Sequence, residues 1–162
     1  MIEYRKAAVD DIDELVKLRI EFLKEANHEI NIDAEILNKC EEALYDYFNS
    51  RMIDDSFIAW IALDEGKIIA TSGMCFYNTP PLFKKVDGVM HFMDGRVAYI
   101  MNMYTLREFR RQGVAKILFN RIVEEAKSLG YRKITLHATE MGRKLYKTFG
   151  FVEVDDEMVL NI

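Results

Sequence analysis

The chain has 162 residues, of which 50% are hydrophobic and 12% aromatic, and its formal net charge is −5. This composition supports the core of one domain over residues 1–162, and it excludes a disordered chain and a general nucleic-acid-binding protein. No apolar stretch approaches the ~18 residues that a membrane span needs, so we expect a soluble, cytoplasmic protein that does not bind a membrane.

Hydrophobic periodicity predicts eleven elements: strands where apolar residues alternate or run continuously, and helices where they recur every three to four positions. In chain order they are a strand at residues 2–8, helices at 11–26 and 34–48, strands at 57–63, 67–77 and 97–105, a helix at 113–129, a strand at 133–138, a helix at 142–149, and strands at 151–155 and 158–162.

Local signals support several of these boundaries. Asp33 can accept a hydrogen bond from the first turn of the second helix, and Gly66 can adopt positive φ in a hairpin turn. Residues 78–95 contain Pro80-Pro81 and show only weak periodicity, so we predict a loop there. Strands outnumber helices, and only the second half alternates as strand, helix, strand. The expected fold class is therefore α/β, with a mixed sheet covered by helices on both faces.

Charge is distributed unevenly along the chain. Residues 1–60 hold fifteen acidic and seven basic side chains, whereas residues 96–147 hold four acidic and twelve basic ones. Such a separation predicts one pole for an anionic ligand and another for a cationic one, although ordinary solvated helix faces also explain the acidic half. Two separated cysteines, Cys40 and Cys75, form no ligand pattern, so no metal site is expected.

A short segment between a predicted strand and the clearest predicted helix carries the candidate site. Its sequence is Arg110-Arg111-Gln112-Gly113-Val114-Ala115. A glycine before a helix lets the backbone approach a ligand, and the first helical N–H groups favour a pyrophosphate. The arginines add positive charge beside it. Neither a Walker A loop nor a dinucleotide fingerprint is present, and taken alone this segment is also compatible with a plain loop–helix junction.

Two longer motifs surround this segment. Residues 102–115 read Asn-Met-Tyr-Thr-Leu-Arg-Glu-Phe-Arg-Arg-Gln-Gly-Val-Ala, and residues 145–151 read Leu-Tyr-Lys-Thr-Phe-Gly-Phe. The first resembles the acetyl-CoA motif of the GNAT superfamily of N-acetyltransferases, a strand followed by Arg/Gln-x-x-Gly-x-Gly/Ala. The second is similar to the family's Leu-Tyr-x-x-x-Gly-Phe. The resemblance covers about residues 97–155 and implies a central mixed, mostly antiparallel sheet of about seven strands flanked by about four helices.

The resemblance also implies a reaction and the residues that carry it. Acetyl-CoA would be the acetyl donor for a primary amine. The main chain of Met103 and Thr105 would pair with the pantetheine arm, and the amides of residues 111–115 would hold the pyrophosphate. Tyr146 matches the tyrosine that often protonates the departing thiolate, a role that its reference pKa of about 10 suits; a structural core tyrosine is the alternative.

Two positions depart from the family pattern. Thr139 stands where many members have asparagine, and it can still hydrogen-bond the coenzyme; Gly142 stands where they have alanine. No general base is assigned, because Glu140 and His137 have structural roles as good as catalytic ones. A nucleophilic cysteine is not expected, since no histidine lies beside either thiol in the sequence.

The identity of the acceptor is less constrained. Family members bind substrate with the first two helices and the loop before the fourth strand, here about residues 20–35 and 76–96. The first of these regions is acidic, which suggests a cationic small-molecule or peptide amine; its acidic residues are Glu21, Glu25, Glu29, Asp33 and Glu35. Aromatic and methionine-rich segments fit an adaptable pocket, core packing or a homodimer interface. A non-catalytic acetyl-CoA-binding module and an unrelated phosphate-binding protein are the alternative functions.

Overall fold

The computed structural model describes residues 1–28 and 30–154. Its helices are α1 (Ile12–Ala26), α2 (Ala34–Ile53), α3 (Val114–Ser128) and α4 (Glu140–Thr148). Its strands are β1 (Glu3–Lys6), β2 (Phe57–Asp64), β3 (Lys67–Asn78), β4 (Leu82–Val86), β5 (Val89–Met93), β6 (Arg96–Thr105) and β7 (Lys133–Leu136). Two 3₁₀ turns, η1 (Val9–Asp11) and η2 (Arg107–Phe109), connect them.

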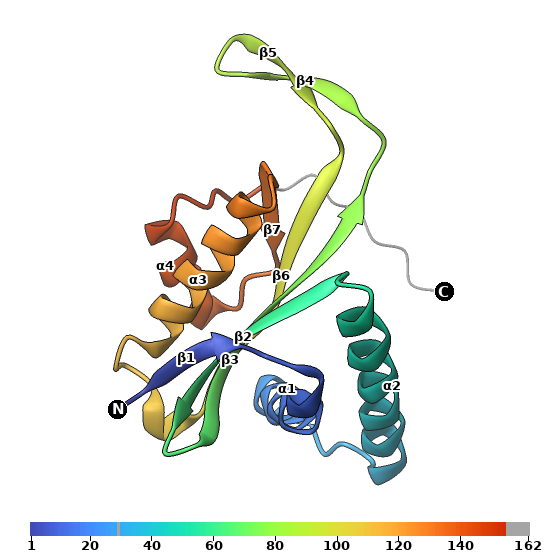
Figure 1. Ribbon diagram of the computed structural model, residues 1–162, viewed down its shortest axis with the longest axis vertical. Coiled ribbons are helices and arrows are strands. Elements are labelled where there is room, and N and C mark those ends of the chain that lie inside the picture. Colours follow the sequence, from blue (N-terminus) through green and yellow to red (C-terminus); the bar gives the residue numbers. More distant parts are fainter. Residues whose placement is uncertain (29, 155–162) are drawn as a thin grey trace.

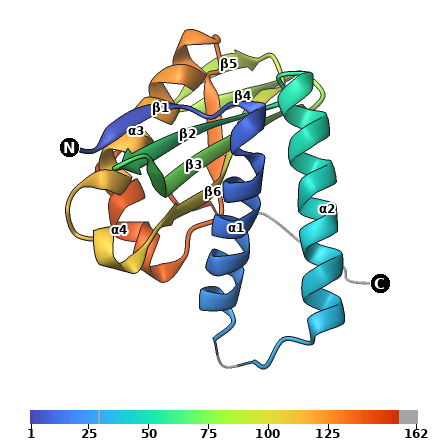
Figure 2. The same cartoon turned by 60° about the horizontal axis from the view of Figure 1, so that its bottom comes forward.

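Five strands form the central sheet, in the order β1-β2-β3-β6-β7. Neighbouring strands are antiparallel except for β6 and β7, which are parallel. Helices α1 and α2 cover one face of this sheet, and α3 and α4 cover the other (Figures 1 and 2). With the separate β4–β5 sheet, the described residues hold seven strands and four α-helices, which confirms the predicted mixed α/β fold.

A hydrophobic core lies on each side of the sheet. On the α1–α2 side, Leu15 and Phe48 pack with Phe57 of β2; on the α3 side, Phe119 and Ile122 pack against β6. All five side chains are at most 1% exposed. Burial of each such side chain contributes about 1.5–3 kcal/mol, so the helical spacing that predicted α1 and α3 also fixes these helices on the sheet.

One capping signal and one turn signal are confirmed, at Asp33 and Gly66. The Asp33 carboxylate accepts a hydrogen bond from the Glu35 amide at 2.7 Å, at the start of α2. Gly66 has a φ of +79° in the turn between β2 and β3. Asp33 therefore sets the start of α2, and Gly66 the turn from β2 to β3, as the sequence indicates.

The prediction of a loop at residues 78–95 is wrong. This segment contains the two-stranded sheet β4–β5, which stands away from the body of the protein (Figure 1). The two strands meet at Asp87-Gly88, where both residues have positive φ, of +49° and +84°. An Asp-Gly turn of this kind matches the twist of a hairpin, and Pro80-Pro81 precede β4 instead of interrupting it.

The C-terminal third differs from the prediction in two further places. Helix α4 begins at Glu140 instead of Gly142, because the Thr139 hydroxyl accepts a hydrogen bond from the Gly142 amide at 3.2 Å and caps the helix earlier. Residues 151–154 form no strand, contrary to the predicted strand at 151–155. Asp155 and the last predicted strand, at residues 158–162, lie outside the described residues.

Candidate active site

The site is built where β6 separates from β7. The two strands pair at four positions, from Val97 with Lys133 to Ile100 with Leu136, where β7 ends. Strand β6 continues to Thr105, and within the described residues no strand pairs with this edge of it beyond Ile100. Main-chain groups of β6 at and beyond Met101, those of Met103 and Thr105 among them, therefore lie along an edge that no described strand pairs with.

A β-bulge interrupts the unpaired half of β6. Between Thr71 and Gly73 of β3 the partner changes from Tyr104 to Met101, so β6 contains one extra residue. Asn102 lies in this bulge with a φ of +57°, a conformation that asparagine tolerates better than most residues. Bulges of this kind change the direction in which a strand presents its backbone groups.

Sequence reasoning missed Asn102 as a site residue. Its side chain is 3% exposed, and neither its amide nitrogen nor its oxygen has a hydrogen-bond partner among the described residues. A buried polar group without a partner costs about 1–3 kcal/mol and is retained in a fold for a reason such as ligand or water binding. An asparagine within an otherwise apolar strand was the available signal.

The start of α3 has the form of an anion site. Gly113 is the N-cap residue, with a φ of +83°, and no side chain caps the helix. Its first turn contains no acidic residue, so the amides of Val114 and Ala115 are not covered by a carboxylate of that turn. An added Cβ at Gly113 would meet nothing within 4 Å, so the space beside this residue is open.

The neighbouring residues hold this loop in place. Val114 is 2% exposed and packs in the core beside Leu118, which anchors the first turn of α3. The Gln112 side chain donates a hydrogen bond to the Glu108 carbonyl at 3.0 Å, so it braces the loop. Arg111, with a φ of +63°, is exposed next to the helix start. That its charge lies beside the uncapped amides remains a prediction.

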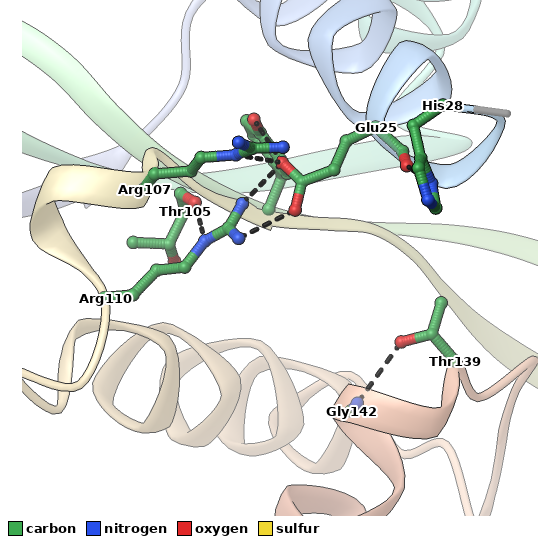
Figure 3. Close-up of polar contacts among 8 residues, drawn as sticks. Glu25, His28, Thr105, Arg107, Arg110, Thr139 and Gly142 are labelled. Carbon is green, nitrogen blue, oxygen red and sulfur yellow. Dashed lines mark hydrogen bonds and ion pairs between the residues drawn. The ribbon is translucent and has the colours of Figure 1, made fainter.

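Arg110 is held by a carboxylate from a distant part of the chain. Its guanidinium donates to the two oxygens of Glu25, on α1, at 2.7 and 2.8 Å, and its Nε donates to the Thr105 carbonyl at 2.8 Å (Figure 3). Arg107 and the Tyr104 hydroxyl also donate to Glu25, at 3.3 and 3.2 Å. Arg110 therefore joins α1 to the end of β6, and most of its charge is balanced before a ligand binds.

The same contacts engage Glu25, one of the acidic residues of the predicted substrate-binding region, in ion pairs with basic side chains. Hydrogen bonds from Arg110, with those from Arg107 and Tyr104, lower the pKa of Glu25 to about 2. A cavity of about 320 Å³ next to it carries charges of both signs; its lining residues are Glu21, Lys24, Glu25, His28, Tyr104, Leu106, Arg107 and Glu108. Glu29, which also supported the cationic hypothesis, lies outside the described residues.

We expect Glu25→Gln to lower the free energy of unfolding by about 2 kcal/mol at neutral pH, allowing for solvent screening of a partly exposed pair. Because the folded-state pKa of Glu25 is depressed from 4.5 to about 2, its contribution is present above the unfolded value and is lost as the pH falls through the folded one. In urea unfolding, the difference between wild type and variant should therefore shrink between about pH 5 and pH 2.

Glu21→Gln is the matched control, since Glu21 is an exposed glutamate one turn earlier on α1. It has no ion pair within residues 1–28 and 30–154. Equal destabilisation by the two substitutions, or a Glu25 effect that persists at the lowest pH, contradicts the proposed contribution of the Arg110 pair.

Tyr146 lies on the opposite face of the sheet from Glu25. Its ring is 8% exposed and packs against Phe119 with ring centroids 5.2 Å apart. Burial raises the pKa of the Tyr146 phenol, so it stays protonated at neutral pH. Gly142 makes room for the ring, because an added Cβ would lie 2.8 Å from a ring carbon of Tyr146. This contact gives a physical reason for glycine where the family often has alanine.

The remaining candidates lie near the end of β7. Thr139 is exposed, and its oxygen caps α4, while its O–H can still donate to a ligand. His137 follows β7, and its Nδ1 is 2.6 Å from the Tyr99 hydroxyl of β6. Glu140 is the exposed first residue of α4. Cys40 and Cys75 are free thiols.

Neither a metal-ligand cluster nor a membrane-spanning helix is present among residues 1–28 and 30–154. None of their His, Cys, Asp and Glu side chains gather in threes or more at a position that could hold a metal ion. No described helix combines the length and apolar character needed to cross a membrane. The features that stand out in the described part of the chain are thus the unpaired strand edge and the uncapped helix start, a combination typical of an α/β protein that binds an extended anionic ligand through its main chain.

Comparison with known proteins assigns the family. The model of the acetyltransferase (GNAT) family matches residues 20–151. A predicted acetyltransferase from Clostridium acetobutylicum, with a crystal structure that includes acetyl-CoA, is 35% identical and has a TM-score of 0.83, over 99% of this chain and 96% of that one. A GCN5-related N-acetyltransferase from Ralstonia eutropha JMP134 is 27% identical with a TM-score of 0.84, over 100% and 99% of the two chains.

A curated relative agrees over a shorter stretch. The uncharacterized N-acetyltransferase YsnE of Bacillus subtilis is 38% identical over 69 residues, which are 40% of this chain and 46% of that protein. The matched stretch is thus less than half the length of this relative. The chain belongs to the acetyltransferase (GNAT) family, as its two motifs predict, and its class of enzyme is acetyltransferase.

Proposed function

We propose that this protein transfers the acetyl group of acetyl-CoA directly to a primary amine, and that residues 1–162 form one such N-acetyltransferase domain. The observation that carries the proposal is the unpaired edge of β6, which leads into the uncapped start of α3. Together they offer a strip of main-chain groups for the pantetheine arm and a cluster of amides for the pyrophosphate.

The residues of this strip have hydrogen-bonding groups that could bind acetyl-CoA. Met103 and Thr105 would pair with the amide groups of the pantetheine arm, and the Thr105 carbonyl keeps a second lone pair beside its bond from Arg110. The amides of residues 111–115 would hold the pyrophosphate, with Arg111 as the neighbouring cation. Arg110 and Gln112 would act by holding the loop, while Thr139 would donate to the coenzyme from the start of α4.

Acetyl-CoA, when bound, supplies an activated thioester, and the protein supplies position and protons. The neutral amine attacks the thioester carbon, so that a C–N bond forms and the C–S bond breaks. The Tyr146 hydroxyl donates its proton to the departing sulfur, and the attacking nitrogen loses a proton to solvent or to a basic side chain. A main-chain N–H near the bulge at Asn102 would stabilise the negative charge on the carbonyl oxygen.

The nature of the acceptor is a separate part of the proposal. Three of the five acidic side chains behind the cationic hypothesis are engaged with other groups: Glu25 binds Arg110, Asp33 caps α2, and Glu35 pairs with Lys39 at 2.6 Å. A small-molecule or peptide amine remains the proposed acceptor, and the cytoplasmic location remains a prediction.

A thermal-shift experiment tests the donor assignment. Acetyl-CoA at one hundred times its dissociation constant would stabilise the folded protein by about 2.7 kcal/mol and raise its melting midpoint. ATP at the same concentration should leave the midpoint unchanged. A shift with ATP alone would support an unrelated phosphate-binding protein, and binding of acetyl-CoA without turnover of any amine would support a non-catalytic module.

We further propose that the β4–β5 hairpin mediates a homodimer. Its two-stranded sheet is of a size that is marginally stable by itself, and it exposes large apolar side chains, with Phe83 76% and Phe92 72% exposed.

Sedimentation should show a wild-type dimer, and the double substitution Phe83→Glu with Phe92→Glu should convert it to a monomer. Ile36→Glu, at an exposed position on α2, is the control. A monomeric wild type at tens of micromolar contradicts this proposal.

A further inference from the structure

Arg19, on α1, is a partly buried cation that binds no carboxylate within the part of the chain that the structure describes. Its guanidinium lies 5.1 Å from the centre of the Phe22 ring. It makes no hydrogen bond or ion pair with any residue in the described ranges, whereas Arg5 and Arg110 each bind a carboxylate there. Burial lowers the pKa of Arg19, which indicates a charge taken partly out of water without full compensation.

The described groups that act on this guanidinium include no carboxylate. Those that act on the pKa of Arg19 are the phenols of Tyr99 and Tyr47 and the thiol of Cys40, all of which counter the effect of burial. Burial raises the pKa of Tyr47 to about 12, so its phenol is uncharged at neutral pH, and its hydroxyl contacts the Met101 sulfur at 3.5 Å. The five N–H donors of this guanidinium thus bind no carboxylate of residues 1–28 or 30–154.

The region lies beside the proposed site of chemistry. Tyr99 immediately precedes Ile100, the last residue of β6 that pairs with β7, and its hydroxyl contacts His137. Helices α1 and α2, which carry Arg19 and Tyr47, lie side by side over this face of the sheet (Figure 2). Tyr146 lies in the core on the other face. An acceptor that enters from the α1–α2 side would therefore approach the gap between β6 and β7 past Arg19.

From this arrangement, and resting on the proposed function, we propose that Arg19 binds an oxyanion of the acceptor. The acceptor would then be an amine that also carries a carboxylate or a phosphate, not a polyamine. A guanidinium binds either group through two parallel N–H donors, which would fix the distance between the acid group and the attacking nitrogen. Arg19 would determine which acceptor is bound, and it would do so without contacting the reacting atoms.

The test compares acceptors in pairs that differ only in charge. Free α-amino acids are measured against their α-amides, and phosphoethanolamine against ethanolamine, with thiol release and acetylated product both followed. Wild type should prefer the acidic member of at least one pair, and the pair that shows the preference distinguishes a carboxylate from a phosphate. Arg19→Gln should lower kcat/KM for that acceptor by about 30- to 100-fold, mostly through KM, and for its neutral partner by less than about threefold.

Two further variants test whether the effect belongs to the guanidinium of Arg19. Arg19→Lys keeps the charge but loses the planar pair of donors, so it should recover part of the loss. Arg121→Gln removes a guanidinium that lies 5.4 Å from the Trp60 ring, on α3 at the other face, and should have no effect. Equal losses on both members of each pair, or a wild-type preference for neutral acceptors, overturn the inference while leaving the proposed function intact. A wild type that acetylates no amine overturns both.

Discussion

Replacing Tyr146 by phenylalanine is expected to lower kcat by about 100-fold, because general acid catalysis typically contributes a factor of 10² to 10⁴. The KM for acetyl-CoA should change little, since the phenol acts on the departing sulfur. The fold should tolerate the change, because the ring keeps its packing against Phe119. Steady-state kinetics at saturating acetyl-CoA, with urea unfolding of the same samples, separates these effects.

Two other variants distinguish a catalytic phenol from a packing residue. Tyr131→Phe alters a tyrosine in the same core, where its ring stacks on Phe76 at 4.6 Å, and should leave kcat within about twofold of wild type. Gly142→Ala displaces the Tyr146 ring without removing its hydroxyl, so we expect kcat to fall by about tenfold. A kcat for Tyr146→Phe within threefold of wild type would assign Tyr146 to the core alone.

Replacing Gly113 by valine is expected to weaken acetyl-CoA binding by about 100-fold. Valine strongly disfavours the φ of +83° that Gly113 adopts, so the loop would relax and turn its amides away from the pyrophosphate. Hydrogen bonds to charged groups contribute about 1.5–3 kcal/mol each, and the loss of one or two of them accounts for this factor. Isothermal titration calorimetry with acetyl-CoA measures it.

Gly66→Val is a closely matched control for this substitution. Gly66 has a φ of +79°, and like Gly113 it has nothing within 4 Å of an added Cβ, but it lies in the turn between β2 and β3. Both variants should lose stability by similar amounts, and only Gly113→Val should lose affinity. If the two variants bind acetyl-CoA equally well, the start of α3 is not the pyrophosphate site.

The sequence predicts best those elements whose signals are local. The apolar spacing of α3, the glycine before it and the Leu-Tyr-x-x-x-Gly-Phe motif all lie within short segments, so the fold class and the family could be predicted, and a candidate position for the site could be proposed. The β4–β5 hairpin was also encoded locally, at Asp87-Gly88, but the two prolines obscured it. The Asp-Gly turn dipeptide was stronger evidence for a hairpin there than the weak periodicity was for a loop.

Contacts between distant residues could not be predicted in the same way. Glu25 and Arg110 are 85 positions apart, and their pairing depends on α1 crossing the end of β6. The bulge at Asn102 arises from register against β3, which a single strand does not reveal. Arg19 differs from other arginines only through the neutral groups that α2 and β6 place around it. Each of these features changes the chemistry of the site, and each requires the fold to be known.

The most direct test of the proposed function is a single reaction in which purified protein, acetyl-CoA and a panel of amines of differing charge are incubated together. Free thiol and acetylated amine are both quantified, the latter by mass spectrometry. We expect the two products to appear in equal amounts with at least one amine, and Tyr146→Phe to slow both equally. Thiol release without an acetylated amine, or binding of acetyl-CoA with neither product, would contradict direct acetyl transfer to an amine by this protein.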